Sequence, residues 1–281
     1  MEGPGSRERL AEGFALMPSL EWNRSVWARD YDWSDGGEEW SRPYGNSEMQ
    51  WYGSLLPRVH RFLPASHIVE IAPGFGRWTR FLVDMADKVT LIELSEACLD
   101  ACRDRFADRS HVQYVLNDGR SLSAIPDGSA DFFFCFDSLV QAEMDVLSGY
   151  IAQMRAKLTP HGVAFIHHSN AARALIDGCP PEYFLDRGHH RAASVSADAV
   201  ASAAQRHGLI CRTQELLPLG SPTDPSAEMF FLDCITTLAL PGSRWDGPRL
   251  LVENSTFSSE ASCMRSIAPL YGGLAMTAVE R

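Results

Sequence analysis

Seven short apolar segments, separated by stretches of helical or turn character, constrain the fold of this 281-residue chain more than any other feature. Continuous apolar runs of this length are typical of strands covered on both faces, and their alternation with helical patterns predicts a parallel α/β sheet. The expected strands are HIVEIA (67–72), VTLIEL (89–94), VQYVLN (112–117), DFFFCF (131–136), GVAFIHH (162–168), LICRTQELLP (209–218) and MFFLDCITTLAL (229–240).

Helices are predicted between these strands, at 78–86, 95–106, 142–158 and 196–207. Ser95 is a suitable N-cap, and Gly208 is a typical residue to end the last helix. The last two strands are joined by a loop rich in glycine and proline that is too short for a crossover helix, so they must be antiparallel. We therefore expect a Rossmann-like α/β fold with a seven-stranded sheet, helices on both faces and an antiparallel final hairpin.

The expected sheet divides the chain into three parts. Residues 1–66 are rich in aromatic and acidic residues, and are interpreted either as a lid over the site or as a cover for the open face of the sheet. Residues 67–240 form the core. The connection at 170–195 within it is longer than usual and is expected to shape a pocket. Residues 241–281 form an extension that packs on the core or on a second subunit.

Charge and composition exclude several classes of function. A formal net charge of -11 would repel the phosphate backbone of a nucleic acid. No segment reaches the roughly 18 apolar residues of a membrane span, and the chain does not begin like a secretory signal. The seven cysteines lie mostly in apolar segments, as reduced thiols do. We expect a cytoplasmic protein that acts on a small molecule. The sequence leaves open whether the protein forms a homo-oligomer.

The segment EIAPGFG (70–76) joins the first expected strand to the first helix. Gly74 and Gly76 allow the backbone to approach a ligand at the carboxyl end of the strand. The third glycine of the dinucleotide pattern G-x-G-x-x-G is missing, because Thr79 stands in its place. This glycine loop therefore indicates a ligand site and disfavours NAD.

Acidic residues follow the next three expected strands as well. Glu93 ends the second strand about 20 residues past Gly74, where a carboxylate binds ribose hydroxyls in related folds. Asp118 follows the third strand and Asp137 the fourth. A single acid at a strand end is commonly a cap or a solvated loop residue. Three of them after successive strands favour a shared ligand.

With these motifs, the stretch 68–170 resembles the core of class I methyltransferases, which bind S-adenosylmethionine (SAM) and release S-adenosylhomocysteine. The resemblance implies that Asp118 holds the adenine amino group and that Asp137 lies beside the methionine end. Glu70 would offer negative charge to a cationic donor. The expected cofactor-binding residues are Glu70, Ala72, Gly74, Gly76, Glu93, Leu94, Asn117, Asp118, Gly119, Asp137 and Ser138.

A narrower resemblance rests on the blocks YDWSDGGEEWS (31–41), VEIAPGFGRWT (69–79), FDSLVQAE (136–143), FIHHSN (165–170) and HRAASVSA (190–197). They are similar to bacterial methyltransferases that modify sugars and secondary metabolites. The resemblance implies methyl transfer to a hydroxyl of a small polar acceptor, such as a sugar or a glycosylated natural-product intermediate. The chain departs from the pattern at Gln141, where a histidine is expected, and at 190–192, where HWRA is expected.

A hydroxyl acceptor needs a general base, and a positioned histidine contributes about a hundred- to ten-thousand-fold to such reactions. His167 and His168 end the fifth expected strand, and the alternation of side chains lets only one of them enter the site. We prefer His168, which lies closer to the following loop, over His167. Asp137 would orient the base or bind the donor's amino group. A structural role in the core is the alternative for either histidine.

The expected acceptor-binding residues are Tyr31, Trp33, Asn170, Arg191 and Ser194. No metal site is predicted, although Asp137 and Asn170 could supply oxygen ligands to a divalent metal. Two other functions stay open. The protein could methylate the nitrogen of an amino sugar or other amine, which needs a weaker base, or it could be a regulator or scaffold that binds SAM without catalysis.

Overall fold

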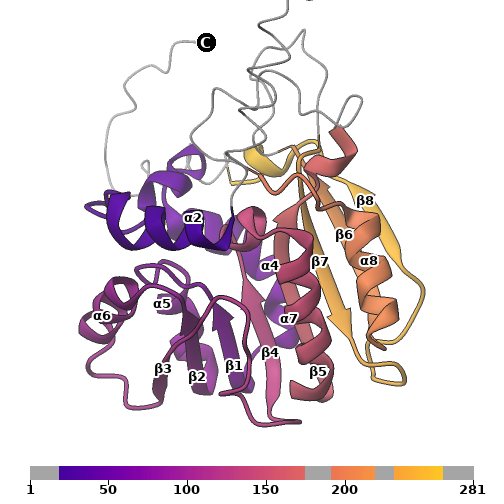
Figure 1. Cartoon of the computed structure of the whole chain (residues 1–281), viewed down its shortest axis with the longest axis horizontal. Coiled ribbons are helices and arrows are strands. Elements are labelled where there is room, and N and C mark those ends of the chain that lie inside the picture. The colour runs from indigo at the N-terminus through magenta and orange to yellow at the C-terminus, as the bar shows by residue number, and fades with distance from the viewer. Residues whose placement is uncertain (1–18, 175–190, 219–230, 262–281) are drawn as a thin grey trace, which may run out of the picture.

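The chain folds around one mixed sheet in the computed structural model, which describes residues 19–174, 191–218 and 231–261. The strand order within these residues is β3-β2-β1-β4-β5-β7-β6-β8 (Figure 1). The strands are β1 Ala65–Ile71, β2 Ala86–Glu93, β3 Val112–Leu116, β4 Ala130–Cys135, β5 Leu158–Ser169, β6 Ile210–Leu217, β7 Asp233–Ala239 and β8 Leu250–Glu253.

The predicted Rossmann-like fold and its antiparallel final hairpin are confirmed. Strands β3, β2, β1, β4 and β5 are parallel, and β7 runs antiparallel to both of its neighbours. The expected number of strands is wrong, because β8 adds an eighth strand beside β6 in the described part of the chain. Its four residues follow a turn-rich segment and are too few for a recognisable periodic pattern.

Helices cover both faces of the sheet, and α7 and α8 stand side by side on one of them (Figure 1). The α-helices are α2 Leu20–Ser25, α3 Ser47–Gln50, α4 Leu56–Val59, α5 Thr79–Leu82, α6 Glu96–Arg105, α7 Met144–Lys157 and α8 Ala197–Arg206. The π-helical segments are η1 Val26–Asp30 and η3 Trp51–Leu55. The 3₁₀ segments are η2 Glu38–Tyr44, η4 His60–Phe62, η5 Val83–Met85, η6 Leu139–Gln141, η7 Ala171–Ala174 and η9 Phe257–Ser259.

Local capping explains where two of these helices begin. The Ser95 side chain accepts a hydrogen bond from the Cys98 N–H, as expected for an N-cap, and Ser196 caps α8 in the same way. The helix expected at 78–86 is shorter, because α5 ends at Leu82 and continues as a 3₁₀ turn. In the part of the chain that the structure describes, no helix is long and apolar enough to cross a membrane.

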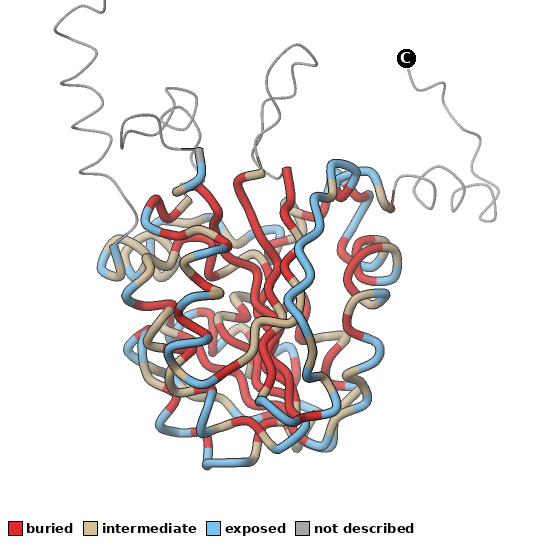
Figure 2. The backbone as a smooth tube through the Cα atoms, turned by 90° about the vertical axis from the view of Figure 1, so that its right-hand side faces the viewer, coloured by how far each residue is buried: buried red, intermediate tan, exposed pale blue. Residues whose placement is uncertain are grey.

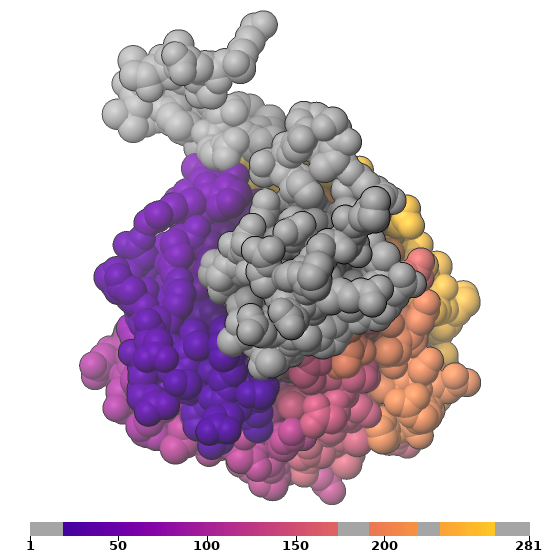
Figure 3. Space-filling model, turned by 45° about the horizontal axis from the view of Figure 1, so that its top comes forward, coloured from indigo at the N-terminus to yellow at the C-terminus, as the bar shows by residue number. Residues whose placement is uncertain are grey.

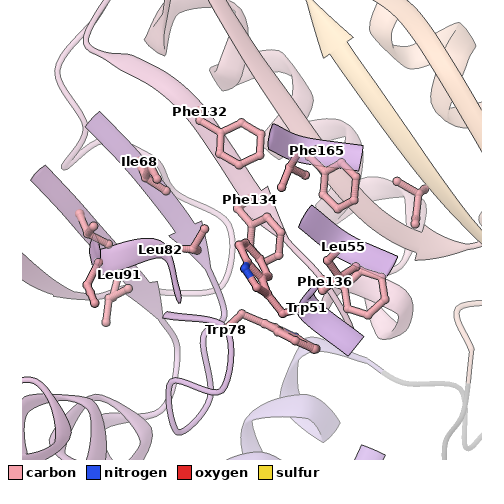
Figure 4. Packing of buried hydrophobic residues seen from close by; sticks show 14 of the residues in the cluster. Trp51, Leu55, Ile68, Trp78, Leu82, Leu91, Phe132, Phe134, Phe136 and Phe165 are labelled. Carbon is pink, nitrogen blue, oxygen red and sulfur yellow. The ribbon is translucent and has the colours of Figure 1, made fainter. Parts of the chain in front are cut away.

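The two faces of the sheet carry separate hydrophobic layers, because neighbouring strand residues point to opposite sides. Phe132 and Phe134 join the layer beneath α4 to α6, whereas Phe133 packs against α7. Figure 4 shows the first layer, in which the Trp51 indole lies close to Phe134. An apolar layer therefore covers each face of the sheet.

The N- and C-terminal parts pack on this sheet. In Figure 1, α2 lies across the end of the sheet where the parallel strands finish. The described part of the extension packs on the core, one of its two expected positions: Phe257 is fully buried, and the Trp245 ring contacts Phe62 with ring centroids 5.0 Å apart. The Trp245 Nε1 donates to the His161 carbonyl at 2.8 Å.

Candidate functional site

A cavity of about 300 Å³ lies at the carboxyl ends of β1 to β4. Strand order reverses between β1 and β4, and open α/β sheets bind ligands at such a reversal. Eight of the residues expected to bind cofactor line the cavity, two at the carboxyl end of each strand: Ala72 and Gly74, Glu93 and Leu94, Asn117 and Gly119, and Asp137 and Ser138.

The loop after β1 is shaped by left-handed backbone at Ala72 (φ 54°), Gly74 (φ 57°) and Gly76 (φ 77°). A Cβ added at Gly76 would lie 2.6 Å from the Phe106 ring, so only glycine lets this loop pack on α6. A Cβ at Gly74 would lie 2.8 Å from the Trp33 ring. Gly74 therefore faces the cavity and its aromatic cover, whereas Gly76 supports the loop from behind.

Glu93 fixes the junction between this loop and β2. Its Oε1 accepts hydrogen bonds from the N–H groups of Leu94 at 2.7 Å and Ser95 at 3.0 Å, and its Oε2 accepts one from Gly74 at 3.2 Å. Burial raises the pKa of Glu93, although these three bonds act in the opposite direction. The carboxylate is held rigidly at the cavity wall, where the sequence placed it.

The structure places neither Glu70 nor Asp118 on the cavity wall, although both were expected to bind the cofactor. Glu70 is buried and accepts a hydrogen bond from the Thr79 hydroxyl at 2.6 Å, and burial raises its pKa to about 8. It is therefore largely protonated at neutral pH and does not line the cavity. Asp118 is exposed, and its Oδ1 accepts bonds from the N–H groups of Arg120 and Ser121, both at 2.8 Å. Asp118 caps its own turn.

Asp137 lies on the cavity wall between a guanidinium and an imidazole. Its Oδ2 is 2.7 Å from Arg77, and its Oδ1 is 3.3 Å from the His167 Nδ1. The Asp137 N–H also donates to that Nδ1 at 3.1 Å. Burial raises the pKa of Asp137, but the contacts with His167 and Arg77 outweigh it and lower the pKa to about 2. The carboxylate stays ionised.

Sequence reasoning missed Arg77. Its side chain is only 5% exposed and lines the cavity, with the guanidinium 4.5 Å from the Trp78 ring centroid and 5.2 Å from that of Trp40. It donates to the Ser41 hydroxyl at 2.9 Å as well as to Asp137. In the sequence, an arginine at the start of a helix is interpreted as a solvated residue. The signal that could have identified Arg77 is its place in the block GRWT, which contributes to the resemblance.

His167 continues this network away from the cavity. Its Nε2 is 3.4 Å from Asp233 Oδ2, and Arg191 binds Asp233 with two hydrogen bonds of 2.7 and 2.8 Å. Burial lowers the pKa of His167, but the contacts with Asp137 and Asp233 raise it by more. A buried row of alternating charge results, and Arg191 contacts Asp233 in this row rather than facing the acceptor as expected.

The structure places His167 beside Asp137 and directs the preferred His168 away from it. His168 is fully buried, with Nδ1 2.7 Å from the Ser169 carbonyl and Nε2 2.7 Å from the Thr236 hydroxyl. Burial lowers its pKa to about 4. Strand alternation correctly predicted opposite directions, but His168 shares the face of Ile166 beneath α7 and α8, whereas His167 points toward Asp137.

Two further acceptor candidates serve the fold instead. The Asn170 amide donates to the Phe231 carbonyl at 2.7 Å and accepts from the Ala197 N–H at 2.8 Å. The Ser194 hydroxyl accepts from the Met144 N–H at 2.9 Å and so satisfies the first N–H of α7. Neither lines the cavity, which corrects the expectation for both.

Aromatic side chains of the N-terminal segment cover the cavity. Trp33 lines it and stacks on Phe75 with ring centroids 4.6 Å apart, and Trp27 lines it as well. Tyr31 packs behind them, 4.9 Å from each of these two indoles, and its hydroxyl donates to Glu39. The expectation of a cavity-facing position therefore holds for Trp33 and not for Tyr31.

This cover is fastened to the loop after β4 through Gln141, where the resemblance led us to expect a histidine. The Gln141 Oε1 accepts from the Trp27 Nε1 at 3.0 Å, and its carbonyl accepts from the Asn23 amide at 3.1 Å. Figure 3 shows the indigo N-terminal segment against the magenta core. Of the two interpretations of 1–66, residues near Trp27 and Trp33 cover the cavity, while Trp51 packs on the sheet.

The described residues contain no group of three or more His, Cys, Asp or Glu side chains that could hold a metal ion. The oxygen ligands considered from the sequence do not converge, because the Asn170 Oδ1 is bonded to a backbone N–H and Asp137 to Arg77. Part of the expected acceptor loop, 175–190, lies outside the residues that the structure describes, as do 1–18 and 262–281.

Comparison with known proteins is consistent with this geometry. Residues 68–162 match the family model described as a methyltransferase domain. The comparison with curated proteins gave no match. Among solved structures, the CcbJ methyltransferase from Streptomyces caelestis matches with a TM-score of 0.55 at 16% identity, covering 77% of this chain and 98% of that one.

Two other solved structures are similar over most of the chain. A SAM-dependent methyltransferase from Leishmania major matches with a TM-score of 0.55 at 14% identity, covering 82% of each chain. The [4+2]-cyclase SpnF matches with a TM-score of 0.50 at 17% identity, covering 68% of this chain and 82% of that one. At these identities the likeness shows the shared fold, and the presence of a cyclase means that fold alone does not fix the reaction.

Proposed function

We propose that this protein is a SAM-dependent methyltransferase and that it transfers the methyl group to a hydroxyl of a small polar acceptor, such as a sugar or a glycosylated natural-product intermediate. The observation that carries the proposal is the ionised Asp137 on the cavity wall, backed by His167 and Arg77. A hydroxyl loses a proton during methylation, and Asp137 together with His167 can accept that proton. An amine acceptor would need only a weaker base.

The donor set around the cavity fits SAM. Glu93, which already orders the loop through Gly74, would accept hydrogen bonds from the ribose hydroxyls. Asn117 and Gly119 would flank the adenine, with Asp118 outside the contact. When bound, SAM supplies the electrophilic methyl carbon on its sulfonium.

The methionine end of the donor carries one positive and one negative group. Arg77 and Asp137 lie side by side on the wall, 2.7 Å apart. A guanidinium binds a carboxylate with paired hydrogen bonds, and a carboxylate binds an ammonium group. We assign Arg77 to the donor's carboxylate and Asp137 Oδ2 to its amino group, which leaves Oδ1 directed at His167.

His167 is the proton-holding group in this proposal. In the neutral ring, Nδ1 accepts the Asp137 N–H and Nε2–H faces Asp233. Asp137 Oδ1 accepts the acceptor's hydroxyl proton and passes it to Nδ1, which releases the Asp137 N–H as it becomes a donor to Oδ1, while Asp233 stabilises the resulting imidazolium. His167 is fully buried, so it receives the proton through Asp137 and does not contact the acceptor itself.

The aromatic cover completes the site. Trp27 and Trp33 present apolar ring faces to the cavity, which would exclude water and stack on a sugar or ring. Closure over the donor would be held by the hydrogen bonds that Trp27 and Asn23 donate to Gln141.

The test combines titration calorimetry with SAM and mass spectrometry of products from a panel of matched hydroxyl and amine acceptors. The proposal expects SAM binding and a product heavier by one methylene unit, with the added methyl on oxygen. Methylation only at nitrogen would overturn the choice of a hydroxyl. Binding of SAM with no product from any acceptor would favour a regulator or scaffold.

A further inference from the structure

The outermost strand, β8, exposes three consecutive large apolar side chains. Leu250, Leu251 and Val252 are 47%, 52% and 47% exposed. Figure 2 shows this strand as a pale-blue run in front of the buried sheet. Exposed apolar edge strands are templates for pairing with another chain, and soluble proteins usually protect them. This edge is therefore a candidate for pairing with a second chain.

The backbone of β8 has hydrogen-bonding groups free to pair. The Asn254 N–H donates to the Leu216 carbonyl of β6 at 3.0 Å, so Val252 and Leu250, two and four residues earlier, also direct their backbone groups at β6. The alternating residues Leu251 and Glu253 direct their N–H and C=O groups outward. In the described residues, no further strand pairs with this side.

The sequence RLLVE (249–253) is complementary to itself when paired antiparallel about Leu251. In that register Leu251 faces Leu251 of the other copy, Leu250 faces Val252, and Arg249 faces Glu253. The outward-directed residues are those that meet as hydrogen-bonded pairs, each exchanging both N–H···O bonds. Opposite charges and apolar pairs across the strands both stabilise such a ladder.

The charged pairs fall on the same face as Leu251. Arg249 binds Asp198 of α8 at 2.8 Å, which places its guanidinium on the α8 side of the sheet. The guanidinium carries five N–H donors, so it can hold Asp198 and a second carboxylate together. On this face a Leu251 pair would be flanked by two Arg249–Glu253 pairs. The opposite face would hold two Leu250–Val252 pairs.

We propose that this edge is a homodimer interface, in which β8 of two copies pair antiparallel around a twofold axis at Leu251 and join the two sheets into one. The cavity lies at the ends of β1 to β4, at the other side of the sheet, so pairing leaves the donor site open. Interfaces below about 1,200 Å² are mostly transient. A strand of this length therefore predicts a concentration-dependent equilibrium between monomer and dimer.

The first test measures the molar mass of the full chain by light scattering or sedimentation over a range of protein concentrations. We expect the mass to rise from monomer toward dimer. Leu251→Lys should keep the protein monomeric, because two lysines would meet at the axis. Leu116→Lys on β3 is the matched control, since Leu116 is 51% exposed at the opposite edge of the sheet, and it should dimerise normally.

A second test fixes the register. Glu253→Arg should weaken the dimer by placing arginines opposite each other, and adding Arg249→Glu should restore it. Leu251→Cys should form an intermolecular disulfide on mild oxidation, because Cα atoms of a hydrogen-bonded pair lie about 5.5 Å apart. A protein that stays monomeric at every concentration overturns the proposal. So does a dimer that persists with Leu251→Lys, or that shows no cross-link at position 251.

Discussion

Replacement of His167 by Asn tests the proton-holding role most directly. The substitution removes the ring that contacts Asp137 and Asp233 but leaves the lining of the cavity intact, because His167 does not reach it. We expect turnover to fall by about a hundredfold or more, the range for loss of a general acid–base group, with little change in the dissociation constant of SAM. A histidine with a purely structural role would instead lower stability and leave turnover per folded molecule unchanged.

The raised pKa of His167 predicts the direction in which activity changes with pH. The pKa of His167 is raised above its ordinary 6.5, and only the neutral ring can take the proton. Activity should therefore rise with pH through that raised pKa. The protonated ring, held between two carboxylates, stabilises the fold, so its contribution is complete below pH 6.5 and is lost as pH rises through the raised pKa. Activity and the free energy of unfolding should change in opposite directions.

A second pH effect belongs to Asp137. Its pKa is about 2 instead of 3.8, which corresponds to roughly 2 kcal/mol of stabilisation at neutral pH. That stabilisation is present above pH 3.8 and is lost as pH falls through about 2. Because His167 supplies part of the depression, His167→Asn should raise the pKa of Asp137, which can be followed by NMR titration of its carboxyl carbon.

The assay compares initial rates and SAM titration for the wild type, His167→Asn and His168→Asn across pH. His168→Asn is the matched control, since His168 is equally buried on the neighbouring position of β5. It should cost about 1–3 kcal/mol of stability through the hydrogen bond to Thr236 while turnover per folded molecule stays the same. Equal losses of turnover in both variants, or an unchanged pH profile in His167→Asn, would refute the reasoning.

Three further predictions concern the donor site. Gly74→Ala should weaken SAM binding by about tenfold in calorimetry, because it adds about 1 kcal/mol of left-handed backbone strain and a contact with Trp33. Gly128→Ala is the control, since it adds similar strain (φ 63°) where no other atom of the described residues is near, and it should bind SAM normally. Arg77→Leu should raise the dissociation constant of SAM by tenfold or more, as loss of a charge-assisted bond costs about 1.5–3 kcal/mol. Gln141→Ala should destabilise the closed cover by about 0.5–1.5 kcal/mol, measured as faster quenching of Trp27 fluorescence by acrylamide, and unchanged quenching would contradict the fastening role.

The sequence predicted the sheet well because its strands are buried on both faces, which leaves an unmistakable apolar pattern. DFFFCF (131–136) is an example, since it supplies Phe132 and Phe134 to one layer and Phe133 to the other. Strand β8 has no such pattern, because it is an exposed edge strand of four residues. The apolar residues there could not be told from an ordinary surface segment.

Side-chain direction after a strand was the weakest part of the site prediction. The spacing placed Glu93 and Asp118 at strand ends equally well, but only Glu93 turns inward, where backbone N–H groups hold it. Asp118 caps its own turn instead. Neighbouring residues of a strand point to opposite faces, so His167 and His168 were expected to point in opposite directions. The alternation does not say which of them points toward the site, because that depends on the register of β5 against β4 and β7. Arg77 became identifiable only through its contact with Asp137.

In the described residues, left-handed backbone outside glycine occurs at Ala72 (φ 54°) and Asp137 (φ 61°). These two residues follow β1 and β4, the strands between which the order of the sheet reverses, and the Ser138 hydroxyl ties them together by donating to the Ala72 carbonyl at 2.7 Å. Such conformations cost about 1–3 kcal/mol each and persist only where surrounding contacts determine them. Asp137 is held by its N–H bond to His167 and its carboxylate bond to Arg77. Because a relaxed backbone at this position would turn the carboxylate away from both partners, the strain maintains an ionised group at the cavity wall.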